Sequence, residues 1–253
     1  MKKIIFTLII IMMLSGVVLA VPEWEAVRTD EAPTINAEFE EIWSKATVFE
    51  LSQDIVDQGG TILVIDEKDV LSRAEIYLLW DQDNLYLYAK VEDQDPYFSK
   101  EYGEMLNSGT DAIQLCIEPI NKRLDNNNLA FIFDLTADSA DDSGALVWEH
   151  WQFGSNVDEI IIEGKVTDNG YEIEAAIPWD ILNYEDYEIT DVSQVEAIMN
   201  YDLKVEVGTE FPFGMTLLDA SVQQAVHTLL FDFGDGEMVI GQPLHWNTLT
   251  LVE

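Results

Sequence analysis

Cysteine is almost absent from this sequence. Cys116 is the only one in 253 residues, so the chain cannot form an internal disulfide. An exported domain without disulfides is held together by packing, with or without the help of a bound metal. Cys116 itself lies in an apolar, strand-like segment, which predicts a buried and unreactive thiol.

Basic residues are also scarce. The chain has 12 Lys and Arg against 49 Asp and Glu, and its formal net charge is −37. Such a surface repels phosphate backbones and anionic membranes, which excludes nucleic acid as a partner. Neutral sugars and divalent cations remain compatible. The acidity has two explanations that can coexist: solubility, including in salty surroundings, and carboxylate-rich loops that bind calcium.

Catalytic signatures are missing. The sequence has no His-Glu-x-x-His, no Gly-x-Ser-x-Gly and no phosphate-binding loop, and its histidines are only His150, His227 and His245. With 49 acidic residues, a pair of carboxylates resembling an acid and a base arises by number alone. We therefore expect a protein that is not an enzyme.

The one long apolar run is at the N-terminus. Lys2 and Lys3 precede an apolar stretch over residues 4–14, and small residues end at Ala20, which is the order of a cleavable secretory signal. The alternative is an uncleaved membrane anchor, which needs all of residues 4–21 to reach a spanning length. Residues 21–253 contain no linker. We expect a signal peptide over 1–20 and one domain over 21–253, in a protein that is secreted, periplasmic or on the cell surface.

The remaining signal is mostly alternation of apolar and polar residues. Residues 74–80 and 85–91 predict an antiparallel hairpin around the polar turn 81–84, with the second strand half-buried. Many short strands with little helix indicate a sandwich or barrel. Further strands are expected at residues 112–117, 129–135, 145–153, 159–166, 171–177, 213–218, 228–233 and 248–252.

Helical signals are few. Phe39, Ile42 and Trp43 recur at helical spacing and predict one short N-terminal helix over residues 38–45, capped by Asn36. Pro178 directly follows a strand and indicates a helical turn over 178–182. The pattern over residues 186–206 fits either helix or strand.

The segments carry a series of landmarks in fixed order, of which the strand ending in Ile177-Pro178-Trp179 is the most distinctive. The series resembles the family 9 carbohydrate-binding modules and their DOMON-like relatives over residues 33–252. The resemblance implies an antiparallel β-sandwich of immunoglobulin-like or jelly-roll type, structural calcium and recognition of sugar-chain ends. Such modules accompany xylanases and other glycoside hydrolases, or cell-surface proteins. The other landmarks are Pro33 to Ala37 with Trp43, Leu85 to Asp93, Asp111 to Leu115, Tyr171 to Ala176, Phe213-Gly214, Leu218 to Ala220 and Trp246 to Leu249.

One departure from the family pattern matters. In sugar-binding members two tryptophans clamp the sugar, one just before the strand that matches 111–115 and one in the loop before the last strand. Here the corresponding segments, residues 106–110 and 237–243, contain no aromatic residue. Either the site is rebuilt from other side chains or this member binds something else.

A sugar ring packs its C–H face on an aromatic plane while its hydroxyls bond to amides and carboxylates. Trp148 and Trp151 lie three apart and so on opposite faces of a strand, and we favour Trp151 as the exposed one. The other candidates are Tyr97, Phe98 and Tyr102, close to where the family's first tryptophan would lie. Four tryptophans at scaffold landmarks are expected in the core: Trp43, Trp80, Trp179 and Trp246.

For calcium, the candidate ligands are Asp93, Asp95, Asp111 and Asp219, which lie in loops or at strand ends where oxygen ligands can converge. Any one of them is also an ordinary turn residue. A second acidic loop, residues 138–144, does not have the spacing of an EF-hand loop.

The leading interpretation is an exported, non-catalytic module that binds polysaccharide of the xylan or cellulose type in support of carbohydrate catabolism. Its partner would be a glycoside hydrolase or a cell-surface assembly. One alternative is a DOMON-like haem-binding domain, with ligands among the three histidines and Met105, Met199 and Met215. Another is a surface or assembly protein that keeps the scaffold without a sugar site.

Overall fold

The computed structural model describes residues 24–52, 61–64, 72–98, 110–123, 129–138, 144–150, 157–184, 198–199, 201–220, 226–231, 244 and 246–253. The expected signal peptide and two expected sugar-binding residues, Tyr102 and Trp151, lie outside this set. No helix within these ranges is long and apolar enough to cross a membrane.

The described residues are almost entirely β-structure, as the alternating pattern predicted. The strands are β1 (Trp24–Arg28), β2 (Val48–Leu51), β3 (Thr61–Val64), β4 (Arg73–Trp80), β5 (Asn84–Glu92), β6 (Ala112–Ile117), β7 (Phe131–Thr136), β8 (Leu146–His150), β9 (Ile161–Thr167), β10 (Gly170–Pro178), β11 (Glu210–Ala220), β12 (Val226–Phe231) and β13 (Asn247–Val252). The sequence pattern did not predict β1, β2 or β3.

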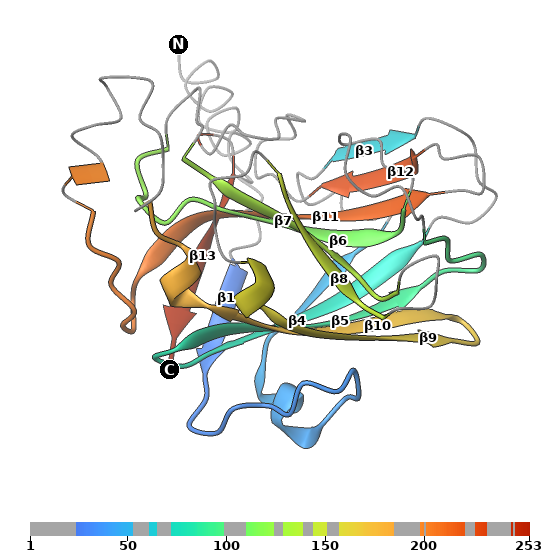
Figure 1. Ribbon diagram of the computed structural model, residues 1–253, viewed down its shortest axis with the longest axis horizontal. Coiled ribbons are helices and arrows are strands. Elements are labelled where there is room, and N and C mark those ends of the chain that lie inside the picture. The colour runs from blue at the N-terminus through green and yellow to red at the C-terminus, as the bar shows by residue number, and fades with distance from the viewer. Residues whose placement is uncertain are drawn as a thin grey trace, which may run out of the picture.

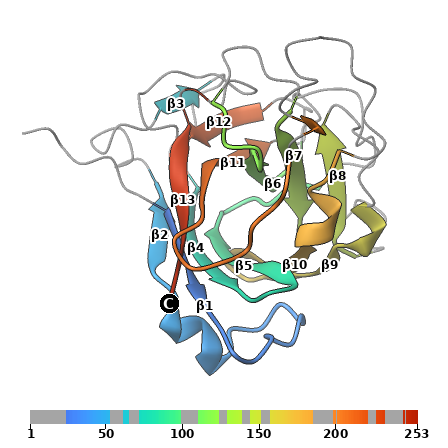
Figure 2. The same cartoon turned by 90° about the vertical axis from the view of Figure 1, so that its left-hand side faces the viewer.

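All these strands belong to one sheet that nearly closes on itself. Its main path runs β8-β7-β6-β11-β13-β1-β4-β5-β10-β9, while β12 joins β11 to β3 and β2 pairs with β4. Figure 1 shows β6, β7 and β11 in one layer above β4, β5, β10 and β9, and Figure 2 shows β13 and β1 along the side that connects them. The expectation of a purely antiparallel sheet is wrong at that side, because β1 pairs in parallel with both β13 and β4.

The predicted hairpin is present. β4 and β5 pair antiparallel from Arg73 opposite Glu92 to Trp80 opposite Leu85. The turn is held by Asp81, whose Oδ1 accepts the backbone N–H groups of residues 83 and 84, both at 2.8 Å. A short polar side chain at a turn can satisfy the local backbone in this way.

The main core lies between the two layers. Residues of alternate positions on both layers point inward, and Trp24 packs edge-on against Phe213 with ring centroids 5.5 Å apart. The four tryptophans expected in the core are all buried, and so is Cys116. Burial also raises the pKa of the Cys116 thiol well above its usual value, which keeps it protonated.

The second strand of the hairpin is more buried than predicted. Tyr86 and Tyr88, on its outer face, are buried together with Trp43 in a separate cluster. The segment around Trp43 covers this face because Glu174 of β10 anchors it. Its Oε2 accepts the backbone N–H groups of Asn36 and Ala37 at 2.8 and 2.9 Å, and its Oε1 accepts the indole N–H of Trp43 at 2.9 Å.

The expected N-terminal helix is only a 3₁₀ turn, η1 (Glu41–Lys45). Asn36 does not cap it; its Oδ1 accepts the N–H of Glu38, and the capping position is Glu40, which makes no side-chain capping bond. The indole of Trp43 is drawn to Glu174, so tertiary contacts outweigh the helical spacing here. Further 3₁₀ turns within the described ranges include η3 (Val157–Glu159) and η4 (Trp179–Ile181), the latter at the predicted place after Pro178.

Candidate functional site

Three buried aspartates converge at one end of the sheet. Asp93 follows β5, Asp111 precedes β6 and Asp219 lies near the end of β11. One carboxylate oxygen of each lies within 4.8 Å of the others. These are three of the four residues predicted to bind calcium. Asp95 is exposed and lies outside the cluster, to which it contributes a backbone N–H that donates to Asp93 Oδ1 at 3.1 Å.

Backbone and hydroxyl groups hold these carboxylates in place. Asp111 Oδ1 accepts the N–H of Ala220 at 2.6 Å, and its Oδ2 accepts the N–H of Tyr97 at 2.7 Å. Ser72 Oγ donates to Asp219 Oδ2 at 2.7 Å. Burial, and then the nearby charge of Asp93, raise the pKa of Asp111 well above its usual value. A divalent cation would relieve this repulsion, and carboxylate oxygens are the ligands that calcium prefers.

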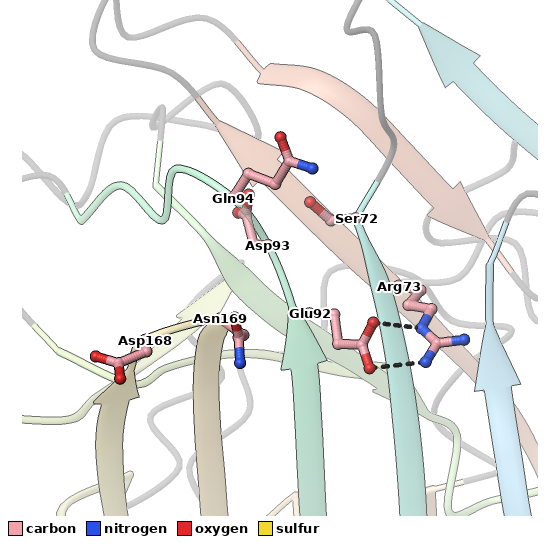
Figure 3. Close-up of a pocket in the computed structure, with 7 residues that line it drawn as sticks. All are labelled: Ser72, Arg73, Glu92, Asp93, Gln94, Asp168 and Asn169. Atoms are coloured by element: carbon pink, nitrogen blue, oxygen red, sulfur yellow. Dashed lines mark hydrogen bonds and ion pairs between the residues drawn. The ribbon is translucent and has the colours of Figure 1, made fainter.

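A pocket of about 520 Å³, lined by residues with polar side chains, adjoins the aspartate cluster. Ser72 and Asp93 line the pocket and also belong to the cluster or contact it. Figure 3 shows Arg73 and Glu92 along one wall, where they form a bidentate ion pair. Arg73 Nε donates to Glu92 Oε2 at 2.8 Å and Arg73 Nη2 donates to Glu92 Oε1 at 2.7 Å. The pocket therefore gives solvent a way to the edge of the cluster. The rest of the lining is Gln94, Asp168 and Asn169.

A second polar feature crosses the other layer of the sheet. Gln114 in β6 pairs with Asp134 in β7 and with Thr216 in β11, and Asp134 pairs with Trp148 in β8. Residues directly opposite one another on neighbouring strands share a face of the sheet. We call these four residues the polar row. Its face is opposite the main core, because Ile113, Leu115 and Phe133 between its members point into that core.

Hydrogen bonding in the polar row is incomplete among the described residues. Gln114 Nε2 donates to Asp134 Oδ1 at 2.8 Å. Gln114 Oε1 and Thr216 Oγ1 are buried and have no hydrogen-bond partner within the described ranges. Leaving such an atom unpaired costs about 1–3 kcal/mol, so each of these two oxygens has unused capacity to accept a hydrogen bond. Trp148, at the end of the row, is half-buried.

An amide, a carboxylate and a hydroxyl beside an indole suit the hydroxyls and C–H face of a sugar. Sequence reasoning found Trp148 but missed Gln114, Asp134 and Thr216. The available signal was a single polar residue within a mostly apolar strand: Gln114 in β6, Asp134 in β7 and Thr216 in β11.

The predicted aromatic residues are spread over different surroundings. Tyr97 and Phe98 are half-buried beside the aspartate cluster, and Phe98 packs edge-on against Tyr171 at 5.5 Å. Trp148 belongs to the polar row on the opposite face of the other layer. The structure thus does not bring Tyr97 and Phe98 into one site with Trp148.

The residues available for haem do not form a pair within the described part of the chain. Met215 is buried in the main core and Met199 is exposed. Met105 and the histidine side chains lie outside the described residues. Nothing described here favours the haem-binding alternative.

Comparisons with known proteins identify the family of the chain. Residues 35–210 match the family model described as carbohydrate family 9 binding domain-like. No curated protein matches the chain. A family 9 carbohydrate-binding module from Caldicellulosiruptor kristjanssonii in complex with cellotriose superposes with a TM-score of 0.62 at 13% identity, covering 91% of this chain and 94% of that one.

Two further solved structures are similar. The Caldicellulosiruptor kristjanssonii module in complex with glucose gives a TM-score of 0.60 at 14% identity, covering 90% of this chain and 95% of that one. A putative carbohydrate-binding protein from Bacteroides uniformis gives 0.49 at 9% identity, covering 91% and 100%. The two Caldicellulosiruptor kristjanssonii structures establish a shared fold at these identities. The family match spans more than half of the chain. The chain belongs to the carbohydrate family 9 binding domain-like family.

Proposed function

We propose that this protein is an exported, non-catalytic module that binds polysaccharide or the ends of sugar chains through the polar row. In this proposal the nearly closed sheet is a β-sandwich of the immunoglobulin-like or jelly-roll type. Binding would bring a partner glycoside hydrolase or a cell surface to glycans of the xylan or cellulose type. No bond in the sugar is made or broken by the module.

The observation that carries the proposal is the pair of buried oxygens in the polar row that have no hydrogen-bond partner in the described part of the chain. Gln114 Oε1 and Thr216 Oγ1 are acceptors for sugar hydroxyls, and the Thr216 hydroxyl is also a donor. Asp134 accepts the amide N–H of Gln114 and so fixes which way the amide points. An amide held in one orientation binds a ligand at a lower entropic cost than a free one.

Charge is consistent with this ligand class. The net charge of −37 disfavours anionic polymers, whereas neutral hexose and pentose chains carry no charge to repel. Trp148 supplies an apolar surface at one end of the row for the C–H face of a sugar ring.

Structural calcium belongs to the same proposal. Asp93, Asp111 and Asp219 would hold the ion, since their carboxylate oxygens converge and are buried. The ion would supply charge neutralisation and tie the ends of β5, β6 and β11 together. An ion that binds only the folded chain stabilises it by mass action.

Affinity electrophoresis tests the proposal directly. The purified protein is run through gels containing xylan, soluble cellulose derivatives and other neutral glycans, with and without chelator. Retardation on at least one glycan is expected, and the dissociation constant then follows from calorimetry with oligosaccharides of that glycan.

Variants locate the site. Trp148→Ala and Trp151→Ala remove the two aromatic candidates on the same chain segment, and Trp151→Ala tests the original sequence-based expectation. A folded, calcium-treated protein that binds no glycan of a broad panel would favour the surface or assembly protein instead. If both variants are retarded on glycan gels as strongly as wild type, the binding site does not lie at this edge of the sheet.

A further inference from the structure

Tyr171 has a buried hydroxyl that the fold alone does not explain. The side chain is 1% exposed, and its hydroxyl has no hydrogen-bond partner among the described residues. The ring itself is accounted for by packing, since Tyr171 lies in the main core and contacts Phe98 edge-on. A phenylalanine would fill the same space without an unpaired polar group.

Tyr171 lies beside the aspartate cluster. It pairs with Val91 in β5, two residues before Asp93. Its ring contact, Phe98, follows Tyr97, whose N–H donates to Asp111 Oδ2. Burial raises the pKa of Tyr171 well above its usual value, and the charges of Asp111, Asp93 and Asp219 add to the effect. Val91 and Tyr171 both point into the main core, and Asp93, two residues after Val91, lies on the same face of the sheet. The phenol is therefore on the side of the sheet where the aspartates converge.

The phenol nevertheless makes no hydrogen bond to any of these carboxylates. Oxygens that surround one calcium ion at 2.3–2.6 Å are about 3–5 Å apart, which is beyond ordinary hydrogen-bonding distance. The carboxylate oxygens of the three aspartates lie within 4.8 Å of one another, which is compatible with this spacing. The Tyr171 hydroxyl oxygen lies on the same side of the sheet as these carboxylates without a hydrogen bond to them, as expected of oxygens that share one calcium ion.

Calcium also needs more ligands than the aspartates supply. It takes 6–8 oxygens, drawn from carboxylates, carbonyls, hydroxyls and water. Both oxygens of Asp111 already accept backbone N–H groups, and one oxygen of Asp219 accepts the Ser72 hydroxyl. On the pocket side, Ser72 and Asp93 leave room for water (Figure 3), but the core side has only buried groups.

We infer that the Tyr171 hydroxyl oxygen is a ligand of the cation bound by Asp93, Asp111 and Asp219, and that it closes the site on the core side. This inference rests on the proposed cation site. The phenol stays protonated, and the ion gains a neutral oxygen that costs no further like-charge repulsion in an already acidic cluster.

The test compares Tyr171→Phe with wild type in cation binding by the stripped protein. Calcium affinity is measured by calorimetry, and terbium is used as a luminescent substitute for calcium. The difference between the terbium luminescence decay rates in H₂O and D₂O counts the water molecules bound to the ion. The expected result is about a tenfold weaker calcium affinity and one additional bound water in Tyr171→Phe, because water replaces the lost oxygen.

Tyr184→Phe is the matched control. Tyr184 is also buried, but its hydroxyl donates to the Leu129 carbonyl at 2.6 Å. This variant is expected to lower the melting temperature of the metal-free protein and leave calcium affinity unchanged. Tyr171→Phe is expected to leave the melting temperature of the metal-free protein unchanged and to lower calcium affinity. The two variants together therefore separate ligation from a general loss of stability.

The possible outcomes are distinct. Equal calcium affinity and an equal number of bound waters in wild type and Tyr171→Phe would overturn the inference while leaving the cation site intact. A wild-type protein that binds neither calcium nor terbium would overturn the cation site itself, and the inference with it.

Discussion

Gln114 and Asp134 are joined across neighbouring strands by a hydrogen bond of 2.8 Å from the Gln114 amide to Asp134 Oδ1. Both side chains are fully buried, so the carboxylate fixes the amide with its oxygen turned away from β7. On the other side of Gln114, Thr216 presents a second buried oxygen without a partner among the described residues. As far as the described residues go, the layer therefore holds a polar site whose own hydrogen bonds are incomplete.

The first prediction concerns that site. Thr216→Val replaces the hydroxyl with a methyl group of similar size, and Gln114→Leu removes the amide. Each change is expected to weaken glycan binding about 10- to 100-fold, since one or two hydrogen bonds to the ligand are lost. The melting temperature is expected to stay the same or rise for Thr216→Val, because the unbound protein loses a polar atom without a partner. Calorimetry and thermal unfolding measure the two effects.

Thr29→Val is the control for this experiment. The Thr29 hydroxyl is buried too, but it donates to the Glu31 carbonyl at 2.6 Å at the end of β1. Its loss should lower stability by about 1 kcal/mol and leave glycan affinity unchanged. Full glycan affinity in both Thr216→Val and Gln114→Leu would rule out the polar row as the binding site.

Much of the fold was visible in the sequence because it depends on local alternation. The hairpin of β4 and β5, the strand β10 and the 3₁₀ turn after Pro178 all carry their signal within a few residues. β1 and β3 carry less, because each is short and pairs with a strand far along the chain. β2 is only four residues long. The parallel pairing of β1 with β13, from Trp24 opposite Leu249, joins opposite ends of the sequence and has no local signature.

The aspartate cluster could be predicted from local sequence, whereas the polar row could not. Asp93, Asp111 and Asp219 were predicted because acidic residues at strand ends stand out from their neighbours. Gln114 and Thr216 lie inside apolar strands, where a single polar residue reads as an ordinary alternation. Only the register between strands places them side by side, and register over about one hundred residues of separation cannot be obtained from one sequence.

The second prediction concerns metal. Adding calcium to the stripped protein at about 100 times the dissociation constant should raise the free energy of unfolding by about 2.7 kcal/mol. Chelator should reverse the rise in melting temperature. Asp219→Asn should abolish most of this response, because it removes one of the three converging charges.

Asp95→Asn is the control, since the Asp95 side chain is exposed and lies outside the cluster. It should retain the calcium response. A melting temperature that is indifferent to both calcium and chelator would count against a structural cation at the three aspartates.

The third prediction concerns the turn between β9 and β10. Gly170 has φ of 141°, and a Cβ there would lie 2.1 Å from the carbonyl oxygen of Val91. Gly170→Ala should destabilise the fold by more than about 2 kcal/mol, through strain and a backbone clash. Gly208 also has positive φ, at 86°, but a Cβ there would meet open space.

Gly208→Ala should therefore cost less, about 1–2 kcal/mol from conformation alone. Chemical denaturation of the two variants measures the difference. Equal losses would show that the approach of Val91 to the turn contributes nothing beyond the backbone conformation.

The last prediction concerns Glu174 and pH. Burial raises the pKa of Glu174 above its usual value, although hydrogen bonds from Asn36, Trp43 and Ala37 act in the opposite direction. The folded protein thus holds this proton more tightly than the unfolded chain does. The resulting contribution to stability is complete below the ordinary glutamate pKa and is lost as pH rises through the folded value.

Glu174→Gln separates this titration from the hydrogen bonds. The variant should be less stable than wild type by about 1–3 kcal/mol, because an NH₂ group replaces one of the two accepting oxygens. Wild type should lose stability relative to Glu174→Gln as pH is raised from ~4 to ~7, the range above the ordinary glutamate pKa. Urea denaturation across this range, with chelator present to remove cation effects, gives the difference at each pH. If wild type instead gained stability relative to Glu174→Gln as pH rises, the three hydrogen-bond donors would lower the pKa of Glu174 more than burial raises it.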